Sequence, residues 1–181
     1  MPRENKTQYA LLGYLHYMPM SGYDLKKSID SSIRFFWQEN YGHIYPVLKR
    51  LEKDGYVTMT VEENPGKPSK KVYAITEKGK DYFREWMDRP PEPENIRKEI
   101  LLKIFFSGFY DDSAIETYIE NEKKQQHELI ETYESIRAHI NSSHQSDEYH
   151  KKRWIITIES GIEMAQSQIR WAETALDMLR A

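Results

Sequence analysis

The 181-residue sequence contains no cysteine, which excludes disulfide bonds, thiolate zinc sites and cysteine nucleophiles. No stretch approaches the roughly 18 consecutive apolar residues that a membrane-spanning helix needs. The apolar patch at residues 9–15 is short, and no small-residue cleavage site follows it, so a signal peptide is not expected. We therefore expect a soluble, cytoplasmic protein with no membrane association.

The motifs of common enzyme classes are also missing. The sequence holds no Gly-rich phosphate loop, no paired-His zinc helix and no nucleophile elbow. We therefore predict no catalytic residue, no metal and no cofactor, and we do not expect an enzyme.

The charged residues are distributed unevenly along the chain. Residues 1–90 hold 15 Lys and Arg against 12 Asp and Glu, a net charge of +3. Residues 91–181 hold 11 against 17, a net charge of −6. A basic front half is typical of a module that binds a polyanion, although ordinary scatter also gives differences of this size.

A proline-rich segment, Pro90-Pro91-Glu92-Pro93, gives the clearest boundary, because proline ends helices and stiffens linkers. We predict a first domain at 1–89, a linker at 90–94 and a helical second domain at 95–181. The second domain is expected to support dimerisation and effector binding.

The first domain shows three helical patterns followed by two stretches of strand spacing. Ser21 and Asp24 form a capping box at the start of the second helix, and Gly55 ends the third. Alternating residues at 57–61 and 71–75 flank a basic turn at 64–69, and Thr76 caps a fourth helix. This order predicts a mainly α fold with a small β-hairpin wing, the winged helix-turn-helix.

The third helix has a face suited to DNA. Ile44, Leu48 and Leu51 share one stripe that must be buried, so the opposite stripe is polar and basic. Cations bind phosphates, and planar or polar groups near the helix start read bases. The predicted DNA-binding residues are Tyr23, Gly42, His43, Tyr45, Lys49, Arg50, Lys67, Lys70 and Lys71. Taken singly, each of these features also fits an ordinary solvated surface.

These segments resemble those of PadR-family transcriptional regulators. In that family a Tyr-Pro pair is followed by Leu, a basic residue, Leu-Glu and Gly, and residues 41–55 match this pattern. Residues 21–25 and 66–79 resemble the family's second-helix start and wing. The second half resembles the branch with a helical C-terminal dimerisation tail in length and helical character. The resemblance implies a dimeric repressor released by a small phenolic or planar aromatic effector.

The last helix carries an unbroken heptad seam with spacings of 3 and 4. Its members are Ile155, Ile158, Ile162, Ala165, Ile169, Ala172, Leu176 and Leu179. The seam predicts contact with a second copy of the chain, and the alternative is a helix that packs on its own domain. A stripe at Leu129, Tyr133, Ile136 and Ile140 on the preceding helix is expected to join the dimer contact.

Four large side chains suggest a cavity for the effector between the two domains. They are Trp37, Trp154, Met164 and Trp171, for which ordinary core packing is the alternative. The sequence as a whole predicts a homodimer that binds double-stranded DNA at a pseudo-palindromic operator. The rival hypothesis is a winged-helix module that binds another protein and lacks specific DNA binding.

Overall fold

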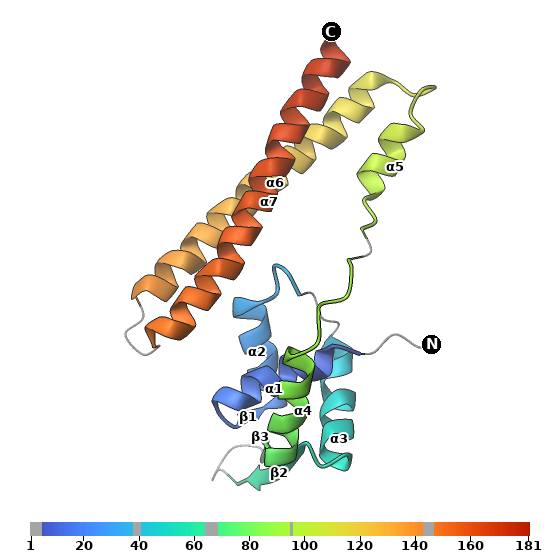
Figure 1. Ribbon diagram of the computed structural model, residues 1–181. Coiled ribbons are helices and arrows are strands. Elements are labelled where there is room, and N and C mark those ends of the chain that lie inside the picture. The colour runs from blue at the N-terminus through green and yellow to red at the C-terminus, as the bar shows by residue number, and fades with distance from the viewer. Residues whose placement is uncertain (1–4, 38–40, 64–68, 95, 143–146) are drawn as a thin grey trace. The chain divides into compact units, whose positions relative to one another are not determined.

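The computed structural model describes residues 5–37, 41–63, 69–94, 96–142 and 147–181 (Figure 1). The chain divides into two compact units, residues 1–93 and 94–181. Within the described ranges, no helix is both long enough and apolar enough to cross a membrane.

The first unit is a winged helix. It comprises α1 (Thr7–Tyr17), β1 (Met20–Ser21), α2 (Gly22–Ser32), the 3₁₀ turn η1 (Tyr41–His43), α3 (Ile44–Lys53), β2 (Val57–Glu62), β3 (Lys70–Ile75) and α4 (Glu77–Met87). The predicted hairpin is confirmed, with Val57 opposite Ile75 and Glu62 opposite Lys70. The strand β1 was not predicted, because two residues are too few to show alternation. It adds a third antiparallel strand beside β3.

The predicted helix boundaries in this unit are confirmed by the capping contacts. The Ser21 hydroxyl accepts a hydrogen bond from the Asp24 amide at 3.2 Å, and the Asp24 carboxylate accepts one from the Ser21 amide at 3.3 Å. Thr76 caps α4 by accepting from the Gly79 amide at 3.0 Å. Gly55 follows α3 with φ of +75°, the left-handed conformation that glycine adopts most readily.

The core of the first unit draws on all three leading helices and the sheet. Its buried members are Leu11, Leu12, Leu15, Leu25, Ile29, Ile44, Val47, Leu48, Leu51, Val57 and Tyr73. The helix α4 covers this core with aromatic rings: Trp86 stacks on Tyr9 with ring centroids 4.5 Å apart, and Tyr82 stacks on Tyr56 at 4.3 Å. This closed core holds the outer face of α3 rigidly toward solvent.

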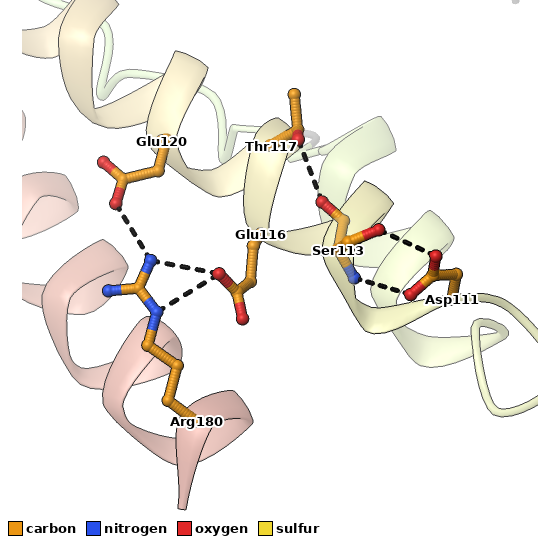
Figure 2. A network of polar contacts seen from close by, with 6 residues as sticks. All are labelled: Asp111, Ser113, Glu116, Thr117, Glu120 and Arg180. Carbon is orange, nitrogen blue, oxygen red and sulfur yellow. Dashed lines mark hydrogen bonds and ion pairs between the residues drawn. The ribbon is translucent and has the colours of Figure 1, made fainter.

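The second unit consists of α5 (Glu99–Phe105), α6 (Asp112–Ser142) and α7 (Glu148–Arg180). Figure 1 shows α6 and α7 running side by side. The helix α6 begins at Asp112, and the carboxylate of Asp111 accepts a hydrogen bond from the Ser113 amide at 3.0 Å. In the next turn Glu116 pairs with Arg180 of α7 at 3.0 Å (Figure 2).

The heptad seam of α7 closes within one chain. Its members Ile158, Ile162, Ala165, Ala172 and Leu176 are at most 5% exposed. Ala172 and Leu176 pack with Ile115 and Ile119 of α6. The other three members, Ile155, Ile169 and Leu179, are half-buried. A heptad stripe predicts that a helix packs against another helix, but it does not indicate whether that helix belongs to the same chain. Here α6 of the same chain supplies much of the contact.

Candidate nucleic-acid interface

The helix α3 separates an apolar face from a basic one. Ile44, Val47, Leu48 and Leu51 are buried, while Tyr45, Pro46, Lys49, Arg50 and Lys53 are exposed. Tyr45, Lys49 and Lys53 are four residues apart, so they follow one line along the helix. This line presents an aromatic ring and two cations to solvent. Lys53 lies on this face but is not among the predicted DNA-binding residues.

The start of α3 adds a positive field to this face. The turn η1 leads into it, Gly42 and His43 are exposed, and the His43 side chain makes no capping hydrogen bond. Amide groups in the first turn of a helix point outward and carry the positive end of its dipole. A phosphate or a base acceptor placed there would be stabilised by that field.

A close approach of two helices fixes the position of Tyr45. A Cβ atom added to Gly22 would lie 2.6 Å from the Cε1 atom of Tyr45, so only glycine lets the ring pack against the start of α2. Tyr45 also lies near Tyr73 of the sheet. The pKa of Tyr73 is raised, mainly by burial and then by the nearby Glu52 and Tyr45. The Tyr45 ring nevertheless remains 55% exposed, and Tyr23 beside Gly22 is also exposed.

The wing contributes cations that differ in their surroundings. The Lys70 ammonium lies 2.7 Å from the Asp24 carboxylate of α2. The hydrogen bonds from Lys70 and then Ser21 hold the pKa of Asp24 below its ordinary value, and Asp24 in turn raises the pKa of Lys70. Lys71 is exposed and makes no ion pair with any residue in the described ranges. Lys67, the third predicted wing cation, lies outside the described residues.

Arg50 is turned toward its own domain. Its guanidinium donates to the Gln8 side chain of α1 at 2.9 Å, and Gln8 donates to the Tyr82 hydroxyl of α4 at 3.0 Å. Sequence spacing placed Arg50 on the exposed face, and the residue is exposed there. The guanidinium thereby links α3 to α1 and, through Gln8, to α4, and the DNA contact of Arg50 stays a prediction.

One group near this face was missed by sequence reasoning. Asp24 of α2 appeared only as a capping residue, and its ion pair with Lys70 depends on how the wing folds back onto α2.

The predicted effector residues do not gather in the second unit. Trp154, Met164 and Trp171 all belong to the unbroken helix α7. At about 1.5 Å per residue, Trp154 and Trp171 lie about 25 Å apart along its axis, too far for one small molecule to touch both. Trp171 packs beside the Ile115–Leu176 cluster, and Met164 is exposed. Trp37 belongs to the first unit.

The fold and this face define a winged helix-turn-helix module with an exposed basic recognition helix. The model of the "Transcriptional regulator PadR-like family" matches residues 11–85, and that of the "Virulence activator alpha C-term" family matches residues 96–180. Residues 11–85 therefore form a domain of the PadR-like family of transcriptional regulators.

The similarity to individual proteins spans both units. The chain is 28% identical to the negative transcriptional regulator PadR of Bacillus subtilis over 95% of this chain and 96% of that protein. It resembles the crystal structure of Bacillus subtilis PadR in complex with operator DNA, with a TM-score of 0.83, 24% identity and coverage of 97% and 99% of the two chains. The structure of that PadR with p-coumaric acid gives a TM-score of 0.77 at 22% identity, covering 96% and 95%.

Proposed function

We propose that this regulator is a homodimeric repressor that binds a pseudo-palindromic operator through α3 and the wing. The observation that carries the proposal is the line of Tyr45, Lys49 and Lys53, exposed on a helix whose opposite face is fully buried. Lys71, Tyr23 and the start of α3 at Gly42 and His43 extend this face. Two such helices related by a two-fold axis would read half-sites about 34–36 Å apart.

The proposed regulator acts in the cytoplasm and has no catalytic role. Its affinity for DNA is lowered by a small phenolic or planar aromatic effector, an idea supported by the p-coumaric acid complex of the Bacillus subtilis protein. Such a ligand acts only by favouring one arrangement of the recognition helices over another. The test is titration of candidate phenols with tryptophan fluorescence and operator affinity as readouts. Unchanged operator affinity with every compound would refute the effector.

The central experiment measures the affinity for DNA from the protein's own upstream region and for a scrambled sequence across a salt series. We expect preference for the upstream DNA, and a logarithm of the binding constant that falls linearly with the logarithm of salt concentration. The slope is about −0.9 for each phosphate neutralised. The slope therefore estimates how many cations of the protein contact DNA phosphates.

The rival hypothesis, a winged helix that binds a protein partner, predicts a different result. Equal, weak binding to both DNAs would favour it, unless a genome-wide DNA pull-down recovers a specific operator elsewhere. The charge-matched control is Lys124→Ala on α6, whose ammonium is exposed and far from α3 in sequence. This variant should retain the wild-type affinity and slope.

A further inference from the structure

The ion pair between Lys70 and Asp24 lies within the proposed DNA-binding face. Lys70 is the first residue of β3 in the wing, and Asp24 lies in the first turn of α2, next to the exposed Tyr23. The charged groups are 2.7 Å apart, and the two side chains remain 43% and 39% exposed. A DNA phosphate and the Asp24 carboxylate are therefore alternative partners for the same ammonium.

The sheet places Lys70 beside the start of α2. Ser21 of β1 lies opposite Val72 of β3, and the two strands are antiparallel. Continuing this register by two residues brings Lys70 next to the first turn of α2, where Asp24 lies. Successive side chains of a strand point to opposite faces, so Lys71 is directed to the other face of β3. The fold therefore gives these two neighbouring cations different surroundings.

The Asp24 carboxylate is held in place without help from Lys70. Its Oδ2 atom accepts hydrogen bonds from the Ser21 hydroxyl at 2.8 Å and from the Ser21 amide at 3.3 Å. Ser21 is itself buried and belongs to β1. The first turn of a helix also stabilises a negative charge through the helix dipole. Lys70 thus has a fixed anionic partner within the domain, whereas a DNA phosphate is present only in the complex.

The ion pair cancels the charge that a phosphate would otherwise meet. Lys71 makes no ion pair with any residue that the structure describes, so its full charge is open to the DNA backbone. Lys70 carries the same charge, but Asp24 offsets it and would repel an approaching phosphate. A cation that neutralises a phosphate adds about 0.9 to the salt slope, and one that stays with a carboxylate adds nothing.

We propose that Asp24 is a positioning residue for DNA binding: it holds Lys70 in the ion pair and so withholds this cation from the phosphate backbone. The wing then binds phosphate through Lys71, and two adjacent lysines have different roles. This inference rests on the proposed DNA-binding function. Phosphate contacts carry no sequence information, so Asp24 lowers the affinity for operator and scrambled DNA alike.

The first test measures the affinity of the full-length protein for scrambled double-stranded DNA across a salt series. Asp24→Asn retains an oxygen that can accept from Ser21 but removes the charge. We expect this variant to steepen the slope by about 0.9 and to bind about fivefold more tightly at 0.15 M salt. The double variant Asp24→Asn with Lys70→Ala should return to the wild-type slope. The matched control is Glu62→Gln, which removes the same charge opposite Lys70 in the sheet and should leave the slope unchanged.

Three outcomes of this test would overturn the proposal. A wild-type slope for Asp24→Asn would mean that Lys70 already contacts a phosphate or reaches none. An equal gain with Glu62→Gln, or a gain that persists in the double variant, would assign the effect to net charge alone. Scrambled DNA keeps the two proposals distinguishable. Lack of preference for upstream DNA counts against the operator, whereas preference with an unchanged slope for Asp24→Asn counts against this inference alone.

A second test uses the wild-type protein and does not depend on the folding of a variant. Acetic anhydride modifies lysine amines, and mass spectrometry of fragmented peptides resolves Lys70 from Lys71. Saturating DNA should slow the acetylation of Lys71 at least about threefold more than that of Lys70, because only Lys71 gains a phosphate partner. A smaller difference in protection would overturn the proposal.

Discussion

The two units bury their side chains in different ways. In the first, five elements converge on one closed core, and the exposed side of α3 carries polar and basic groups. In the second, two helices of 31 and 33 residues pack along each other, and Phe105 of α5 and the aromatic residues that follow it are exposed. The first unit is therefore stabilised by a core shared among many elements, whereas the second depends mainly on one contact between two long helices. Substitutions at matched positions can test this contrast.

The largest expected effect is in the first unit, at Gly79. A Cβ atom there would lie 2.1 Å from the Tyr56 carbonyl oxygen, a backbone atom held by the sheet. Gly79→Ala must therefore push α4 away from the core that it covers, and we expect a loss of more than about 3 kcal/mol in the free energy of unfolding. Urea unfolding measured by circular dichroism would check this. A loss below 1 kcal/mol would show that α4 is loosely attached.

The corresponding glycine of the second unit should tolerate the same change better. A Cβ atom at Gly161 on α7 would lie 2.5 Å from the ring of Tyr133 on α6, which is a side-chain contact. The contacting atoms are the far end of a side chain, which can move more easily than a backbone carbonyl, and alanine favours helix by about 1 kcal/mol over glycine. We expect Gly161→Ala to cost about 1–2 kcal/mol. A cost equal to that of Gly79→Ala would contradict the proposed contrast.

Charge removal on the exposed face should affect DNA binding and leave stability unchanged. Each of Lys49→Ala and Lys71→Ala is expected to reduce the magnitude of the salt slope by about 0.9 and to weaken binding about fivefold at 0.15 M salt. Arg50→Ala should instead lower stability, because its guanidinium binds Gln8 within the domain. Fluorescence anisotropy and thermal unfolding of the three variants would separate the roles. An Arg50→Ala protein with wild-type stability and weakened DNA binding would instead support the predicted DNA contact of Arg50.

The smallest expected effect concerns the pair of Asp24 and Lys70. The pKa of Asp24 is lowered in the folded state, so its contribution to stability is full at neutral pH. It is lost as pH falls below 3.8, the ordinary pKa, through the lowered folded-state value. Since the pair is largely solvated, Asp24→Asn should shift the urea midpoint by less than about 0.5 M at pH 7. Urea unfolding at pH 3 should show a smaller shift, and an equal shift would point to the cap of α2 instead.

Local rules were sufficient for much of the first unit. The Ser21–Asp24 box, the Thr76 cap and Gly55 define helix ends from neighbouring residues alone, and all three predictions are confirmed. Strand alternation likewise located both arms of the hairpin. The strand β1 was not predicted, because its two residues form a strand only through pairing with β3.

The sequence by itself determined which face of each helix is apolar, where most helices begin and end, and that α3 carries an outward line of basic residues. These properties follow from periodicity and local hydrogen bonding, both of which act over a few residues. The tertiary structure alone decided how those faces are used. It paired Lys70 with Asp24, turned Arg50 toward Gln8, placed the seam of α7 against α6 and left the aromatic side chains at residues 105–110 exposed. Each outcome depends on contacts between residues distant in sequence, which periodicity does not encode.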